Sequence, residues 1–185
     1  MSHSPAWLIV PALISPAAMV SPAYAVQYLT TEAAQKVMFP DASAFVPHPV
    51  RLTDAQKNVV EQAAKVRMHF SEQPVWQVMA DGKPAGWFVL DEVYGKHEFI
   101  TYAVALDANG AVKSVEVLDY RESHGGEIRL AGWRKQFVGK TAGDPVELNK
   151  DIRNISGATL SCRHVTEGVQ RLLKVYDVAL RGAAG

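Results

Sequence analysis

The sequence predicts an α+β fold in which helices pack on an antiparallel or mixed β-sheet meander. Runs of β-forming residues lie in the middle of the chain and are separated by turn signals, of which Asn109-Gly110 is the strongest short hairpin signal. Segments on both sides of these runs carry apolar residues at helical spacing. The resulting order of helix, meander, helix, loop and helix is typical of a sheet with helices packed against it.

A short helix and a linker are expected first. The helix begins at Thr30 and ends at Phe39-Pro40, because proline cannot continue it. Residues 41–50 contain Pro47 and Pro49, which is typical of an extended linker.

A second helix is expected before the strands. Thr53 and Gln56 have the spacing of a capping box and begin a helix that reaches about residue 66. One face of this helix carries apolar side chains, namely Val59, Val60, Ala63 and Val66.

Four strands follow, at residues 75–79, 86–94, 98–106 and 111–120. Residues 81–84 form the first turn, Gly95 lies in the second, and Asn109-Gly110 lies in the third. Sequential strands joined by short turns pair as antiparallel neighbours, so a meander is expected.

Two helices are expected after the strands. One spans residues 127–138, ends at Gly139, and has as its apolar side Ile128, Leu130, Trp133 and Phe137. The last runs from Leu160 to about Leu180, and its apolar residues recur at helical spacing and face the core: Val165, Val169, Leu172, Leu173, Tyr176 and Leu180.

The composition is that of one globular domain. The chain has 185 residues, of which 48% are hydrophobic and 21% charged. Nineteen basic residues balance nineteen acidic ones, so no global field draws the protein to nucleic acid, and no nucleic-acid partner is expected. A single cysteine, Cys162, excludes an internal disulfide and a CxxC cluster for zinc or iron–sulfur.

The N-terminus has features of a secretory signal. Its first 25 residues contain no Lys, Arg, Asp or Glu, and Ala23-Tyr24-Ala25 has the A-x-A form that a signal peptidase needs. We therefore expect a signal peptide over residues 1–25, an N-terminal helical and linker segment over 26–74, and the main domain over 75–182, in a periplasmic protein. An uncleaved membrane anchor is the alternative, although three prolines interrupt the apolar stretch: Pro11, Pro16 and Pro22.

The segment that carries most functional information is Ile155 to Cys162, directly before the last helix. Thr159 supplies a hydroxyl, and Gly157 and Ala158 leave the backbone open to close approach. A helix that begins at Leu160 offers unpaired N–H groups and a positive dipole end to a phosphate, and Ser161 can add a hydrogen bond. Ordinary helix capping by Ser156 or Thr159 is the alternative.

Ser156-Gly157-Ala158-Thr159 resembles the S/T-G-A-T flavinylation motif of FMN-binding domains. Such domains occur in flavin-carrying subunits of sodium-pumping NADH:quinone reductases and of Rnf-type electron-transfer complexes. In that family the last Thr of the motif forms a phosphoester with the FMN phosphate. The resemblance covers roughly residues 75–180 and implies covalent FMN on Thr159, with the motif from Ser156 to Ser161 around it.

The resemblance extends to a second loop. Glu122-Ser123-His124-Gly125 occupies the place of the E-T-P-G loop of the quinone-reductase subunits. It implies that Glu122, His124 and Gly125 lie against the flavin. A solvated polar loop is the alternative.

Two positions depart from the family pattern. Many flavinylated relatives carry Asp six residues before the Thr, where this chain has Arg153, and Asp151 is the candidate substitute. Cys162 replaces a residue that is commonly Ser or Thr, and we expect it to be buried and inert.

Other side chains have weaker patterns. Aromatic residues suited to stacking on flavin are more often core residues, and at most one is expected to touch it: Trp87, Trp133 and Phe137. Cys162 and His164 lack further ligands at metal-binding spacing, so no metal is expected. Basic residues flank the motif, and they either dock an acidic partner or are solvated: Lys135, Lys140, Lys150, Arg153 and Arg163.

The resemblance thus implies an exported flavoprotein that carries electrons between a membrane redox protein or cytochrome and an acceptor. It also implies a flavin transferase, using FAD and magnesium, as the modifying partner. Two alternatives stay open: a periplasmic flavin-dependent reductase of a small acceptor, and a flavin-free binding module on the same scaffold.

Overall fold

The computed structural model describes residues 26–68 and 70–183, and its centre is a six-stranded antiparallel sheet. Four strands form the expected meander: β3 (Val75–Ala80), β4 (Lys83–Tyr94), β5 (Phe99–Asp107) and β6 (Val112–Tyr120). The edges are β1 (Val26–Gln27) beside β6 and β2 (Ala44–Pro47) beside β3. The predicted α+β class is confirmed, whereas the predicted signal peptide at 1–25 lies outside the described residues.

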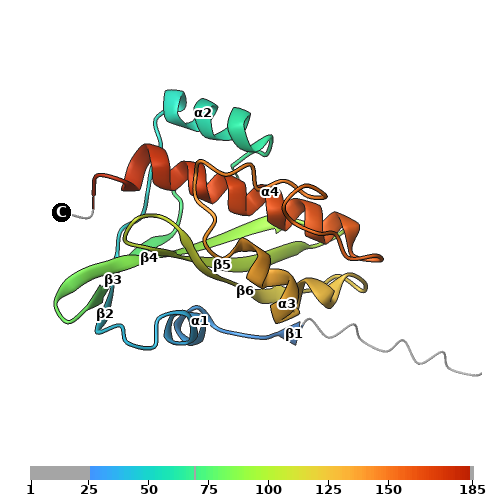
Figure 1. Cartoon of the computed structure of the whole chain (residues 1–185), viewed down its shortest axis with the longest axis horizontal. Helices are drawn as coiled ribbons and strands as arrows, with labels where there is room; N and C mark the ends of the chain where they lie inside the picture. The colour runs from blue at the N-terminus through green and yellow to red at the C-terminus, as the bar shows by residue number, and fades with distance from the viewer. Residues whose placement is uncertain (1–25, 69, 184–185) are drawn as a thin grey trace, which may run out of the picture.

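Helices cover both faces of the sheet (Figure 1). The long helix α4 (Thr159–Val175) lies across one face, with α2 (Asp54–Ala64) packed on its outer side, and α1 (Thr31–Met38) lies on the other face. The larger apolar core lies between α4 and the sheet, and a smaller one lies between α1 and the sheet. The sheet therefore has a core on each side.

The apolar stripe of α4 is buried as its spacing predicts. Val165, Val169 and Leu172 are at most 1% exposed, and Tyr176 and Leu180 in the following π-type turn η3 (Tyr176–Leu180) are also buried. Burial of each such side chain contributes about 1.5–3 kcal/mol, so packing on the sheet fixes this helix.

The N-terminal helices begin where their caps predict. Thr30 accepts a hydrogen bond from the Ala33 N–H at the start of α1, and Thr53 and Gln56 form a complete capping box at the start of α2. The predicted apolar face of α2 is partly wrong, because Val59 is 55% exposed. Val60 and Ala64 are the buried residues of this helix.

Residues 41–50, expected as an extended linker, begin in a turn and contain an edge strand. β2 pairs with β3, with Phe45 opposite Val78 and Pro47 opposite Trp76. Proline is tolerated there because an edge strand leaves one side of its backbone without ladder hydrogen bonds. The N-terminal segment therefore completes the sheet.

The continuous helix expected over 127–138 is wrong. The chain instead forms three short pieces: η1 (Gly126–Arg129), α3 (Ala131–Arg134) and η2 (Lys135–Phe137). They are broken at Leu130, whose backbone is extended and whose side chain is 60% exposed rather than buried. The break lets Ile128, Trp133 and Phe137 all reach the core.

A buried charge cluster joins the C-terminal part of α4 to the sheet. The Arg171 guanidinium donates to Asp91 Oδ2 at 2.6 Å, and the Tyr102 hydroxyl donates to the same oxygen at 2.5 Å. All three side chains are at most 1% exposed. Burial, and then the Asp91 charge, raise the pKa of Tyr102 well above its ordinary value, so the phenol stays protonated.

We predict that Asp91→Ala lowers the free energy of unfolding by about 3–5 kcal/mol, because it leaves the Arg171 charge buried without its partner. Urea unfolding measures this. The control is Arg51→Ala, which removes an ion pair with Glu72 whose side chains are 77% and 37% exposed and should cost less than about 1 kcal/mol. Equal losses of unfolding free energy in the two variants would contradict a buried ion pair between Arg171 and Asp91.

Candidate functional site

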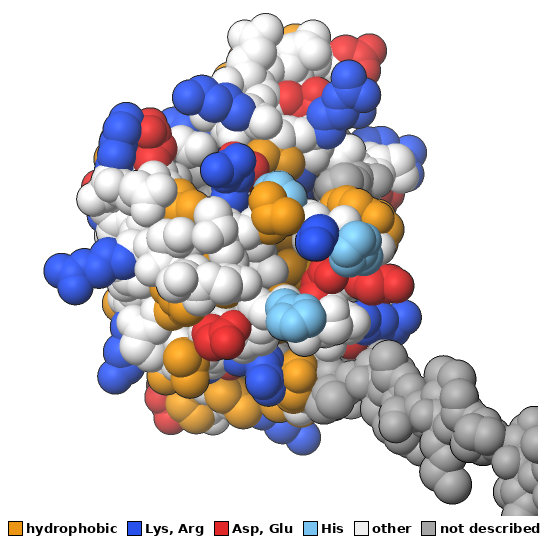
Figure 2. Space-filling model, turned by 90° about the vertical axis from the view of Figure 1, so that its right-hand side faces the viewer, with side chains coloured by type: hydrophobic (Ala, Val, Ile, Leu, Met, Phe, Trp, Pro, Cys, Tyr) orange, Lys and Arg blue, Asp and Glu red, His pale blue; other side chains and the backbone are white. Residues whose placement is uncertain are grey.

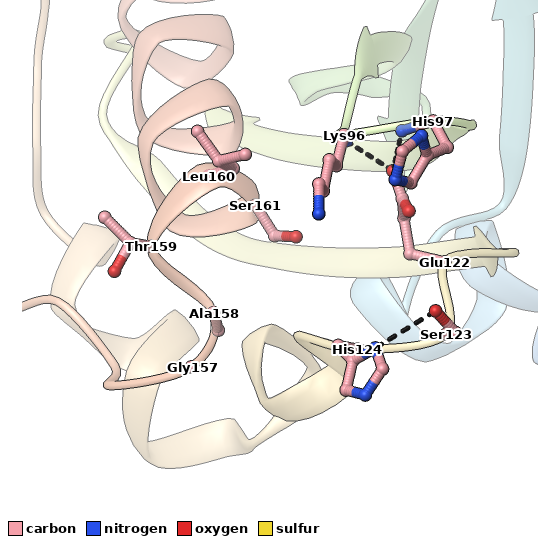
Figure 3. A pocket seen from close by; sticks show the side chains of 10 residues that line it. All are labelled: Lys96, His97, Glu122, Ser123, His124, Gly157, Ala158, Thr159, Leu160 and Ser161. Carbon is pink, nitrogen blue, oxygen red and sulfur yellow. Dashed lines mark hydrogen bonds between the residues drawn. The ribbon is translucent and has the colours of Figure 1, made fainter.

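Three segments distant in sequence converge at one end of the sheet. They are the β4–β5 turn (residues 95–98), the loop after β6 (residues 121–125) and the N-terminus of α4. Between them lies a cavity of about 400 Å³ (Figure 3). Its lining residues are Lys96, His97, Glu122, Ser123, His124, Gly157, Ala158, Thr159, Leu160 and Ser161.

A second cavity of about 550 Å³ adjoins the first. The two share Ser123, His124 and Gly157, and the second extends along η1 to Arg129 and Leu130. On this face of the molecule, histidine and basic side chains gather beside hydrophobic ones (Figure 2). The combined hollow is open and bordered by hydrogen-bond donors.

Thr159 is the first residue of α4, and its side chain is exposed. Its Oγ1 accepts a hydrogen bond from Asn154 Nδ2 at 2.9 Å. The N-cap residue is Ala158, and no side chain caps the helix. The predicted capping alternative, by Ser156 or Thr159, is therefore wrong. The N–H groups in the first turn of α4 have no side-chain acceptor, and this end of the helix borders the cavity.

A hydroxyl pair fixes the helix start against the sheet. The Tyr120 hydroxyl, at the end of β6, donates to the His124 carbonyl and lies 3.0 Å from Ser161 Oγ. Gly125 packs against both hydroxyls with φ +91°, and a Cβ there would lie 2.6 Å from the Tyr120 hydroxyl and 2.9 Å from Ser161 Oγ. Only glycine fits, so this contact holds the loop and the helix in one arrangement.

Glu122 holds the β4–β5 turn. Its Oε1 accepts from the backbone N–H groups of Lys96, His97 at 2.6 Å and Glu98 at 3.1 Å. Burial alone raises the pKa of this carboxyl, but the three N–H donors outweigh burial and lower the pKa below its ordinary value. Glu122 is thus ionised at neutral pH and bound to the chain itself.

The structure brings most of the predicted site residues together. All but one line the cavities: Glu122, His124, Gly125, Gly157, Ala158, Thr159, Leu160 and Ser161. Ser156 is the exception, since it is exposed and lines neither cavity. Lys96 and His97 line the cavity and were not predicted there. In the sequence, Gly95 indicates the turn that carries them, but it does not indicate that the turn lies beside the cavity.

The segment before the motif is anchored through its backbone. The Trp133 Nε1–H donates to the Arg153 carbonyl at 2.8 Å, and Gln136 Oε1 accepts from the Arg153 N–H at 2.8 Å. The Arg153 side chain is exposed. Asp151, the candidate substitute, pairs with Lys140 at 2.8 Å and also accepts from the Glu147 N–H, so it already has structural partners.

Cys162 and the candidate aromatic residues are core residues. Cys162 is fully buried, as expected, and burial raises the pKa of its thiol. Trp87 and Phe137 are at most 1% exposed and Trp133 is 5% exposed. Within residues 26–68 and 70–183, no cluster of three or more potential ligands suits a metal ion, and no helix is both long and apolar enough to cross a bilayer.

Comparison with known proteins gives two findings. Residues 95–174 match the family model of the FMN-binding domain, a range that runs from the β4–β5 turn into α4 and includes all three segments of the site. The chain is also similar to a subunit of the Na(+)-translocating ferredoxin:NAD(+) oxidoreductase complex of Acetobacterium woodii, with 24% identity over 160 residues, which cover 80% of this chain and 74% of that protein.

We predict that Gly125→Ala destabilises the protein by more than about 1 kcal/mol, because its Cβ meets two hydroxyl oxygens at a positive φ. Thermal unfolding measures the change. Gly132→Ala is the matched control, since a Cβ there meets nothing within 4 Å in the short helix α3. Similar unfolding temperatures for both variants would refute the close packing of Gly125.

A second prediction concerns pH. The lowered pKa of Glu122 means that its contribution to stability is present above its ordinary value of 4.5 and is lost as pH falls through the folded-state value. Glu122→Gln should therefore unfold at lower temperature than the wild type at pH 7. The difference in unfolding temperature between Glu122→Gln and the wild type should become smaller below about pH 4.5. A difference in unfolding temperature that stays constant down to pH 3 would contradict the stabilisation of the β4–β5 turn by an ionised Glu122.

Proposed function

Since residues 95–174 match the family model of the FMN-binding domain, we propose that this protein is an exported electron carrier with FMN attached to Thr159 through a phosphoester. The observation that carries this proposal is the exposed hydroxyl of Thr159 on the first residue of an uncapped helix, at the edge of a cavity. A modifying enzyme can reach such a hydroxyl, and the helix end favours the phosphate bonded to it.

The residues around the cavity fit FMN. Gly157 has φ +87° and open space where a Cβ would lie, so a phosphate and sugar chain can approach the backbone there. Two adjoining cavities, of about 400 and 550 Å³, offer room for the ring and its ribityl chain. The bound flavin would supply one- and two-electron chemistry, while the chain holds the ring and leaves one edge accessible.

Attachment is a phosphoryl transfer. The Thr159 oxygen attacks the phosphorus on the FMN half of FAD, the bond to AMP breaks, AMP leaves, and the hydroxyl proton passes to a base of the flavin transferase, which also holds magnesium. The resulting phosphodiester keeps one negative charge. At a helix N-terminus that charge is favoured by about 0.3–1 kcal/mol.

Asn154 prepares the hydroxyl for this step. Because its amide donates to Thr159 Oγ1, the hydroxyl proton is directed elsewhere and one lone pair stays available. The anchored backbone of Arg153 holds Asn154 in place. Arg153 itself points outward where many relatives carry Asp, so the transferase for this chain would accept a basic residue or read the nearby Asp151.

The partners follow from the proposed chemistry. The similar Acetobacterium woodii protein is named as a subunit of a sodium-translocating oxidoreductase complex, which supports a membrane redox protein or a cytochrome as the electron partner of this chain. The uncharged first 25 residues with their A-x-A ending support export to the periplasm. A covalent bond suits that compartment, where dissociated FMN would be lost by dilution.

We predict that the wild-type chain, co-expressed with a flavin transferase, gains the mass of one FMN less one water. Thr159→Ala should gain none, because it lacks the oxygen nucleophile. Thr159→Ser is the matched control and should still gain FMN, since it keeps the hydroxyl. Intact-mass spectrometry and the yellow colour of the purified proteins measure these outcomes.

A wild-type chain that stays colourless and unshifted in mass, beside a positive-control carrier modified by the same transferase, would favour the flavin-free binding module. Modification of the Thr159→Ala chain would show that another side chain carries the flavin.

A further inference from the structure

One cation of the cavity has no role in the proposed attachment. Lys96 projects from the β4–β5 turn into the space between Ser161 and Glu122 (Figure 3). Among the described residues, no carboxylate forms an ion pair with its ammonium. The other charged or titratable groups facing the cavity are His97, His124 and Glu122.

The turn that carries Lys96 is held on both sides. Glu122 Oε1 accepts from three consecutive N–H groups of the turn, and a Cβ on Gly95 would lie 2.5 Å from that oxygen. On the outer side, the Tyr94 hydroxyl donates to the His97 carbonyl at 2.9 Å, and the Tyr94 and Phe99 rings pack edge to face at 5.3 Å. These contacts fix the backbone position of Lys96, from which its side chain extends into the cavity.

The position of Thr159 decides what Lys96 faces. Thr159 and Lys96 line the same cavity from different elements, and the Thr159 hydroxyl accepts a hydrogen bond from Asn154. Figure 3 shows that this hydroxyl points away from Lys96. A phosphate bonded to Thr159 therefore starts at the Asn154 side of the helix end. The first cavity is lined by both Thr159 and Lys96, so a ring that fills it, rather than the second cavity along η1, lies beside the β4–β5 turn.

We propose that Lys96 is a flavin-site residue whose ammonium faces the ring, and that Glu122 acts as a positioning residue for Lys96. This inference rests on the proposed attachment at Thr159. Uptake of two electrons from the redox partner and one proton from solvent leaves one net negative charge on a flavin ring. An ammonium beside the ring favours that charge, so Lys96 raises the reduction potential.

The first test compares the potentials of covalently loaded proteins, each with its FMN confirmed by intact mass, in titrations with dithionite and reference dyes. In Lys96→Ala the equilibrium constant for two-electron reduction of the flavin should fall about tenfold, which lowers the midpoint potential by about 30 mV. Lys96→Arg should keep most of the effect. Lys83→Ala is the control, because Lys83 is exposed at the opposite end of β4, roughly 36 Å away at about 3.3 Å per residue.

The second test asks whether Glu122 acts through Lys96. Removing Glu122 also removes a negative charge, so its own effect on the potential is ambiguous, and a double-mutant cycle isolates the coupling. The Lys96→Ala shift should shrink when measured in a Glu122→Ala background. Glu122→Gln serves as the second background if the alanine variant does not fold.

Each outcome decides one point. Equal potentials for wild type and Lys96→Ala overturn the role of Lys96, and an undiminished Lys96→Ala shift in the Glu122 backgrounds overturns the positioning role. A Lys96→Ala chain that no longer gains FMN, while Lys96→Arg does, assigns Lys96 to attachment and overturns its placement at the ring. A wild-type chain without FMN is a different failure, that of the attachment itself, and it removes both proposals.

Discussion

The structure depends on how the N-terminus of α4 is held at the end of the sheet. No side chain caps this helix, and its first turn is fixed through Ser161, whose hydroxyl meets that of Tyr120. The Tyr120 hydroxyl also donates to the His124 carbonyl, and Gly125 packs against both hydroxyls. One polar contact therefore sets the helix start and the loop after β6 together, and it leaves the helix N–H groups free for an anionic ligand.

Rigid packing farther along α4 supports this arrangement. The Arg171–Asp91–Tyr102 cluster joins the helix to β4 and β5, and the apolar stripe of α4 covers the main core. A buried ion pair contributes little net stability but is costly to break, so it favours one placement of the helix over others. A site at the end of such a helix is held more precisely than one built only from loops.

Sequence alone predicted what local chemistry determines. The Thr53 capping box, the Asn109-Gly110 hairpin and the helical spacing of α4 all depend on residues close in the chain. Non-local contacts explain the errors. Pro47 suggested a linker because its pairing with Trp76 is not visible in the local sequence. The helix break at Leu130 was missed because no proline marks it.

The site shows the same division between local and non-local information. Lys96 reaches the cavity because Glu122, 26 residues away, binds its turn. Glu122 was predicted to touch flavin, and it lines the cavity, but its carboxylate accepts hydrogen bonds from the protein backbone. A sequence pattern cannot distinguish a residue that binds a ligand from one that fastens a neighbouring turn.

The central claim is that one hydroxyl, that of Thr159, carries the flavin. Trypsin cleaves after Arg153 and Arg163 and so releases residues 154–163, which contain Thr159 together with the neighbouring hydroxyls of Ser156 and Ser161. The most direct measurement is fragmentation mass spectrometry of this peptide from protein made with a flavin transferase. Attachment at Thr159 predicts one FMN on the peptide, with fragment ions that place it on Thr159. An unmodified peptide, or FMN placed on either serine, would contradict it.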